Sequence, residues 1–86
     1  MFKKIIENYI NNMTINDIIM FSHKENIYLN DSEYLKIYEF IKHNWDSIIN
    51  NDNLVNDFLI KNFDNEKKDI IYELYLKYQK KYSSYL

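Results

Sequence analysis

Three polar side chains near the middle of the chain have the types and the spacing of a candidate metal site. Glu39, His43 and Asp46 follow one another at intervals of four and three residues, which places them on one face of a helix. Carboxylates and imidazoles bind zinc, but a closed site needs a further ligand that converges from another element. No other segment supplies one. We therefore interpret the three residues as a solvent-exposed charged face and predict no metal site.

Ser22 and His23 are a second candidate pair, a nucleophile next to a base. In a helix the Ser22 side chain falls on the apolar side and the His23 side chain on the polar side, so the two cannot act together. The sequence has no Cys, no Gly and just two His, so thiol nucleophiles, phosphate-binding loops and Gly-rich oxyanion turns are excluded. We predict that the protein is not an enzyme and has no catalytic residue, no cofactor and no small-molecule substrate.

The elements that carry these residues are predicted to be helices. Apolar residues recur at the helical spacing of three and four positions along the chain, and no alternating run with a hairpin turn indicates a strand. The predicted helices cover residues 2–12, 14–26, 32–50, about 54–63 and 65–82, with caps expected at Thr14, within Asn30 to Ser32, and at Asp64 or Asn65. The residues expected to face the core are Phe2, Ile5, Ile6, Tyr9, Ile10, Met13, Ile15, Ile18, Ile19, Phe21, Tyr34, Ile37, Tyr38, Ile41, Trp45, Ile48, Ile49, Leu54, Val55, Phe58, Leu59 and Phe63.

The length and composition predict one all-α domain over residues 1–86, a compact bundle of four to five short helices without a sheet. Eighty-six residues are enough for one small core, and no linker or repeat divides them. The cluster of short polar side chains at residues 50–53 is the strongest helix break in the sequence and could serve as a hinge between two helical halves.

The N-terminal segment gives no sign of export. Lys3 and Lys4 precede an apolar stretch, but Glu7 and Asn8 interrupt it before it could form a signal peptide or a membrane span. We therefore expect a cytoplasmic protein that does not bind a membrane.

Nucleic acid is a disfavoured partner. Thirteen acidic residues against eleven Lys give a net charge of −2, which does not attract phosphates. The second and third predicted helices resemble a helix-turn-helix, but the reading helix would present Lys36 and Lys42 beside Glu33, Glu39 and Asp46. Nucleic-acid binding is kept as an alternative function.

Residues 14–43 resemble a family of small helical proteins of unknown function from low-GC Gram-positive bacteria. The resemblance rests on the stretch from Thr14 to Ile27, a Thr-capped helix with paired aliphatic residues and a small residue, followed by Leu29-Asn-Asp-Ser-Glu33 at the start of a long helix. It implies a helical fold in a bacterial cytoplasm, and it implies no activity or catalytic residue.

The last predicted helix is the best candidate for binding a partner, because Tyr72 and Leu76 widen its apolar stripe beyond one packing face. The stripe consists of Ile70, Ile71, Leu74, Tyr75, Tyr78, Tyr82 and Tyr85. Tyrosine is common in interfaces that are dry in a complex and wet when free. The alternative is that the inner residues of this helix close the core of the protein itself. The candidate partner-binding residues are Phe40, Tyr72, Tyr75, Leu76, Lys77, Tyr78, Lys80 and Lys81.

The sequence thus predicts a helical module that binds another protein or itself, the latter as a homo-oligomer. Besides nucleic-acid binding, the remaining alternative is a mobile-element protein that blocks a host or defence protein by occupying its surface.

Overall fold

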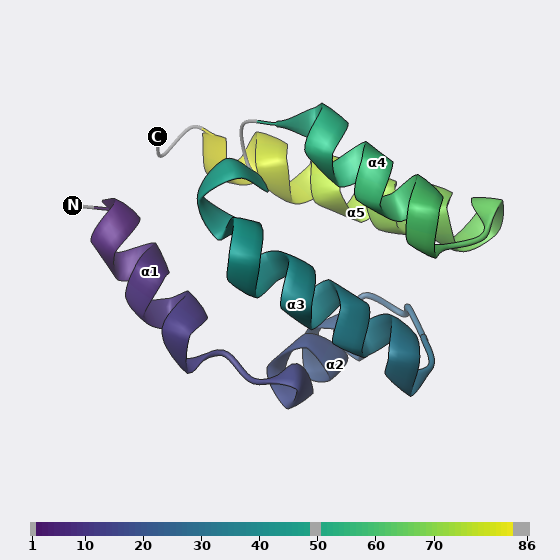
Figure 1. Cartoon of the computed structure of the whole chain (residues 1–86), viewed down its shortest axis with the longest axis horizontal. Helices are drawn as coiled ribbons and strands as arrows, with labels where there is room; N and C mark the ends of the chain where they lie inside the picture. The colour runs from purple at the N-terminus through teal and green to yellow at the C-terminus, as the bar shows by residue number, and fades with distance from the viewer. Residues whose placement is uncertain (1, 49–50, 84–86) are drawn as a thin grey trace. The chain divides into compact units, whose positions relative to one another are not determined.

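The computed structural model describes residues 2–48 and 51–83, and within these ranges it contains five α-helices and no strand (Figure 1). The predicted all-α class is confirmed. The five helices are α1 (Phe2–Asn12), α2 (Ile15–Lys24), α3 (Asp31–Ile48), α4 (Asp52–Asn62) and α5 (Asn65–Ser83). Ile49 and the side chain of Phe2, both predicted to face the core, lie outside what the structure describes. The prediction for Phe21 is wrong: it is 40% exposed, because at about 100° per residue it lies at the far edge of the apolar stripe of α2. No helix in the described ranges has both the length and the apolar character needed to span a membrane.

The starts of α2 and α3 are set by reciprocal side-chain caps. The Thr14 hydroxyl accepts a hydrogen bond from the Asp17 amide at 3.2 Å, and the Thr14 amide donates to the Asp17 carboxylate at 2.9 Å. Asn30 and Glu33 make the same pair of bonds at 2.8 and 2.9 Å. Each pair satisfies two amides that a helix start leaves without a partner. The capping box at Thr14 was predicted, and Asn30 is the cap within the predicted polar cluster.

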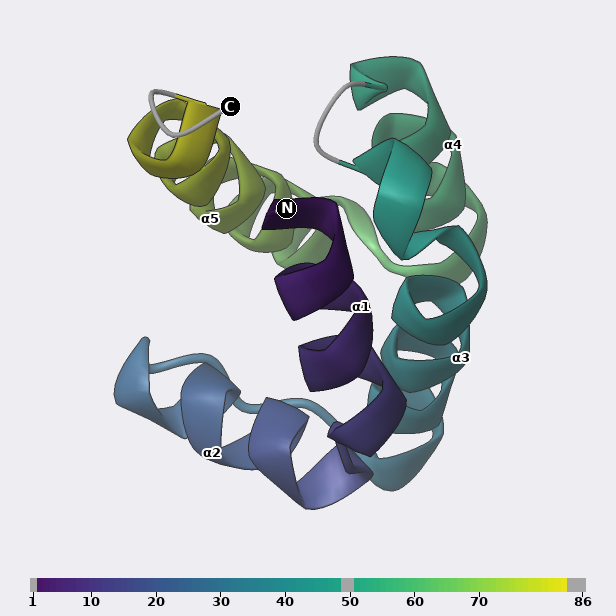
Figure 2. The same ribbon diagram turned by 90° about the vertical axis from the view of Figure 1, so that its left-hand side faces the viewer.

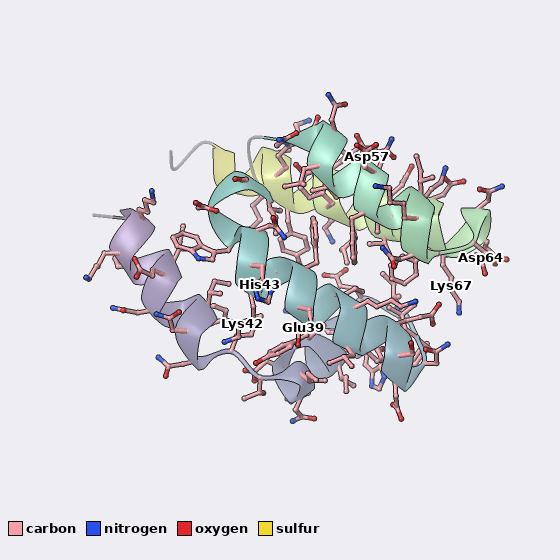
Figure 3. All side chains as sticks on the ribbon, in the orientation of Figure 1. Glu39, Lys42, His43, Asp57, Asp64 and Lys67 are labelled. Atoms are coloured by element: carbon pink, nitrogen blue, oxygen red, sulfur yellow. The ribbon has the colours of Figure 1, made fainter. Side chains whose placement is uncertain are left out.

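Asn and Asp also start the two helices near the C-terminus. The Asn51 side chain accepts from the Leu54 amide at 3.0 Å, and the Asp64 carboxylate accepts from the Lys67 amide at 2.8 Å. Figure 3 labels Asp64 and Lys67 at the turn between α4 and α5. Of the two predicted caps for α5, Asp64 is the one used.

The chain divides into two compact units, residues 1–45 and 46–86, and the division falls within α3. The Asn-rich segment at residues 50–53, suggested as a hinge from the sequence, lies beyond this division. The expectation of one domain over residues 1–86 stays a prediction.

In the first unit, a buried polar cluster connects α2 to the start of α3. The Tyr34 side chain, 3% exposed, donates from its hydroxyl to the Ser22 hydroxyl at 3.0 Å. The Ser22 hydroxyl donates in turn to the Ile27 carbonyl at 2.5 Å, and the Leu29 amide donates to the Tyr34 hydroxyl at 3.3 Å. These bonds tie the connecting segment to both helices.

The connecting segment leaves α2 through Asn26, whose φ is 61°. Asn is the residue that adopts this left-handed conformation most readily after Gly, and the chain contains no Gly. The Ile27 amide then donates back to the Ser22 carbonyl at 2.9 Å, as in a common helix-ending motif.

The predicted core stripe of α1 is partly wrong. Ile10 and Met13 are buried, but the side chains of Ile5 and Tyr9 are 60% and 66% exposed. At about 100° per residue, Ile5 and Tyr9 lie on one edge of the stripe, turned away from the side that carries Ile10 and Met13. The stripe is therefore wider than the surface that packs.

Lysine 42 on α3 completes the C-terminal end of α1. Its ammonium group donates to the Ile10 and Asn11 carbonyls at 2.5 and 3.1 Å, and it lies 5.4 Å from the ring centre of Tyr38. These carbonyls belong to the last turn of α1, where the helix leaves acceptors unpaired and where a positive charge is favourable. Lys42 is labelled on α3 in Figure 3, and both α1 and α3 can be followed in Figure 2, which is turned by 90° from the view of Figure 1.

The second unit is built on a helical hairpin in which α4 and α5 run antiparallel (Figures 1 and 2). Its core comes from α4 and the turn after it, with Val55, Leu59 and Phe63 buried and Leu59 only 1% exposed. The rings of Phe58 and Phe63 pack edge to face, with 6.0 Å between the ring centres. By contrast, none of the described side chains of α5 is buried.

Candidate interaction surface

The candidate metal ligands of α3 lie on its surface. The side chains of His43 and Glu39 are mostly exposed, with 3.7 Å between the His43 Nδ1 atom and a Glu39 carboxylate oxygen. The same Nδ1 lies 2.7 Å from the Glu39 carbonyl oxygen, within hydrogen-bond distance. Within residues 2–48 and 51–83, no three His, Asp or Glu side chains converge in a way that could hold a metal ion. Figure 3 labels Glu39 and His43.

Ser22 and His23 are separated as the sequence indicated. The Ser22 hydroxyl is buried and bonded to Ile27 and Tyr34. The His23 side chain is exposed, and its ring lies 4.7 Å from that of Tyr28 and 6.5 Å from that of Tyr34. The hydroxyl therefore has a structural role in the connection between α2 and α3, and His23 is not placed to take its proton.

The three candidate tyrosines of α5 are half-buried. Tyr75 is the most tightly held, because its hydroxyl proton is shared between the Ile48 carbonyl at 2.6 Å and the Asp52 carboxylate at 3.0 Å. The Gln79 amide donates to the same Asp52 oxygen at 2.6 Å and to the Tyr75 hydroxyl at 3.2 Å. These bonds connect the end of α3 and the start of α4 to the middle of α5.

This environment keeps the Tyr75 hydroxyl neutral. Burial raises its pKa well above the ordinary tyrosine value, and the hydrogen bond to the nearby Asp52 carboxylate raises it further. The Tyr72 ring lies 5.9 Å from the Tyr75 ring. Tyr75 therefore holds the second unit together, a role that the sequence did not separate from partner binding.

The other candidates on α5 are exposed. The Leu76 side chain is 38% exposed, and Lys77, Lys80 and Lys81 are exposed as well. The Lys77 and Lys81 ammonium groups lie 5.4 and 5.7 Å from the ring centre of Tyr78. Such cation–π contacts restrict two of the lysines to the surface around one aromatic ring.

Sequence reasoning missed the N-terminal half of this exposed face. Ile70 is 46% exposed, and the side chains of Glu66, Asp69 and Glu73 are exposed with it. At about 100° per residue, these four and the exposed Leu76 and lysines fall within an arc of roughly 140°. Ile70 was expected to face the core and is exposed instead, and nothing in the sequence grouped these acids with the lysines.

Phe40 is the one candidate partner-binding residue that does not lie on α5. Phe40 lies on α3 in the first unit and is half-buried rather than exposed, so its position off the core stripe does not leave its ring open to solvent. Of the stripe expected on the last helix, the side chain of Tyr82 and the whole of Tyr85 lie outside what the structure describes.

The helix-turn-helix alternative loses one of its two positive charges on α3. The ammonium group of Lys42 is engaged with the α1 carbonyls, whereas Lys36 is exposed. The acids Glu39 and Asp46 remain exposed on the same helix. A phosphate backbone would therefore meet even less positive charge on α3 than the sequence suggested.

Comparison of the chain with models of known protein families, with curated proteins and with solved structures found no match. The resemblance of residues 14–43 to a bacterial family of unknown function stays a prediction.

Proposed function

We propose that this protein is a non-enzymatic helical module that binds a protein partner through the exposed face of α5, in the cytoplasm of a bacterium. We define this α5 face as Glu66, Asp69, Ile70, Glu73, Leu76, Lys77, Lys80 and Lys81. It contains four of the eight residues selected from the sequence.

The observation that carries the proposal is that none of the side chains described on α5 is buried. In a 19-residue helix that packs against a neighbour, the inward side chains are normally removed from water. Here the described side chains of α5 are half-buried at most. The free energy available from burying Ile70 and Leu76 is therefore unused by the fold, and a partner could supply it.

The surface of the whole described chain agrees with this interpretation. Nine large apolar side chains are exposed, against six hydrophobic residues that are buried. A domain of this size buries a limited share of its apolar area, so association is a natural further source of stability. Single exposed apolar residues are common, which is why the proposal depends on α5 rather than on this total.

The test is a pull-down of the tagged full chain from a low-GC Gram-positive lysate, with partners identified by mass spectrometry. The double variant Ile70→Ser/Leu76→Ser removes the apolar side chains from the α5 face. The matched control is Ile60→Ser, which removes an exposed side chain from α4 (55% exposed). Tyr75 is not used, because its substitution would break bonds within the second unit.

We expect the double variant to lose the partners that the unaltered chain and the Ile60→Ser control retain. Circular dichroism spectra of all three chains should be the same, because the substituted side chains are exposed. If the double variant retains every partner, or if the unaltered chain retains nothing beyond the tag alone, the proposed binding face is wrong.

A further inference from the structure

The charges of the α5 face are divided along the helix. The N-terminal half carries the acids Glu66, Asp69 and Glu73, and the C-terminal half carries the bases Lys77, Lys80 and Lys81. The apolar side chains of the same face, Ile70 and Leu76, lie between the ends. No base from the first half and no acid from the second half belongs to this face.

The helix dipole explains part of this pattern but not its middle. Acids are favoured in the first turn of a helix and bases in the last, and the effect falls off beyond those turns. Glu66, Lys80 and Lys81 lie in these terminal turns. Glu73 lies eight residues after the first residue of α5 and Lys77 lies six residues before the last. Both are outside the terminal turns, so the division of charge needs another explanation.

We propose that α5 pairs antiparallel with α5 of a second copy of this chain. A two-fold axis near Leu74 places the acidic half of each α5 face against the basic half of the other. The matched residues are Glu66 with Lys81, Asp69 with Lys80, and Glu73 with Lys77. At a rise of about 1.5 Å per residue, the members of every pair lie within about 3 Å of each other along the helix axis.

This arrangement is self-complementary, as a two-fold dimer requires. Each pair occurs twice, and the two helix dipoles run in opposite directions. The cation–π contacts to Tyr78 already restrict Lys77 and Lys81 to this surface, which lowers the entropy lost on binding. The pair between Lys68 and Asp69, at 3.6 Å, leaves the Asp69 side chain 73% exposed, so this contact costs little to exchange.

The inference rests on the proposed function, since it uses the same face, and it names the partner as a second copy. One helix face is smaller than a standard protein interface, and much of its attraction is between exposed charges. We therefore expect a weak dimer that forms at micromolar or higher concentration and dissociates as salt increases.

The first experiment combines charge reversal with analytical ultracentrifugation of the full chain. One variant carries Glu66→Lys, Asp69→Lys and Glu73→Lys, and the other carries Lys77→Glu, Lys80→Glu and Lys81→Glu. Each alone should dimerise more than about tenfold more weakly than the unaltered chain, because like charges then face each other. An equimolar mixture of the two should recover the dimer.

Matched controls reverse exposed charges on α4, where Asp57→Lys and Lys61→Glu should leave the dimer unchanged. Circular dichroism establishes that each reversed chain is helical. Because the mixture contains the same two variants, recovery of the dimer cannot result from a loss of folding. A reversed variant that is folded and still dimerises by itself would overturn the proposal.

The second experiment tests the orientation, using the absence of Cys from the sequence. Glu73→Cys lies next to the two-fold axis and should form a disulfide-linked dimer under mild oxidation. Glu66→Cys is equally exposed, but antiparallel pairing places the two copies of that position about 24 Å apart. Equal cross-linking of both variants would contradict the antiparallel arrangement.

The outcomes separate the two proposals. An unaltered chain that stays monomeric at all concentrations and at low salt overturns the antiparallel pairing. If the Ile70→Ser/Leu76→Ser variant nevertheless loses a different protein from the lysate, the α5 face is still a binding face for that protein. If the substitutions weaken neither a dimer nor the binding of a lysate protein, both proposals are overturned.

Discussion

Removing the Tyr34 hydroxyl should destabilise the first unit in proportion to the hydrogen bonds that it makes. Tyr34→Phe keeps the buried ring and deletes the bond to Ser22 and the bond from the Leu29 amide. A hydrogen bond within a protein contributes about 1 kcal/mol net, and an amide left unpaired in a half-buried position adds to the loss. We expect the free energy of unfolding to fall by about 1 to 2 kcal/mol.

The assay is urea unfolding followed by the fluorescence of Trp45, the sole tryptophan, which lies in the first unit. The matched control is Tyr28→Phe, because Tyr28 is 67% exposed and its loss of a hydroxyl should change stability by less than about 0.5 kcal/mol. Ser22→Ala and the double variant complete a thermodynamic cycle that isolates the contribution of the bond.

Within that cycle, Tyr34→Phe should lower the free energy of unfolding less when Ser22 is already Ala, because the hydroxyl to which Tyr34 donates is then absent. Two results would refute the reasoning. One is that Tyr34→Phe and Tyr28→Phe destabilise the protein equally, and the other is that the two cluster substitutions are strictly additive.

Four further predictions concern other contacts. Leu59→Ala should lower the free energy of unfolding by about 2 to 5 kcal/mol in thermal or urea unfolding, because it opens a cavity in the second unit, whereas Ile60→Ala should change it little. Lys42→Met should cost about 1 kcal/mol and speed amide exchange in α1 measured by NMR, and unchanged exchange relative to Lys36→Met would contradict its capping role. Because the folded-state pKa of Tyr75 is raised, its contribution to stability is present below the ordinary value of 10.0 and is lost as the pH rises above it; Tyr75→Phe should therefore flatten the alkaline loss of stability in pH-dependent unfolding. Finally, we expect no salt-dependent retention of a mixed DNA or RNA pool on the immobilised protein, and retention that falls with salt would restore the nucleic-acid alternative.

The helices and their starts could be predicted from the sequence because the signals are local. A capping box needs residues three positions apart, and the pair of Thr14 with Asp17 is visible in the sequence. The helical period likewise identifies which side of a helix is apolar. It does not say how wide a surface the neighbouring helices cover, which is why Ile5 and Tyr9 were expected in the core and are exposed.

The contacts between helices could not be predicted, because their partners are far apart in the chain. Nothing local to Lys42 indicates that it binds the carbonyl groups of α1, and nothing local to Tyr75 indicates its bond to Asp52. For the candidate surface, the sequence identified the basic half of the α5 face, where the lysines follow one another. Its acidic half was missed because the sequence does not show that Ile70 and the acids beside it stay exposed, and the helix dipole accounts for Glu66 alone.

The bonds from Lys42 to α1 have a consequence for synthesis of the chain. An isolated 11-residue helix is marginal in water, and the ammonium group that completes its end lies thirty-one and thirty-two residues further along. A ribosome must therefore extrude the first half of the protein before its N-terminal segment can settle. Co-translational folding of this unit should begin with α2 and the start of α3, and α1 should be added last although it emerges first.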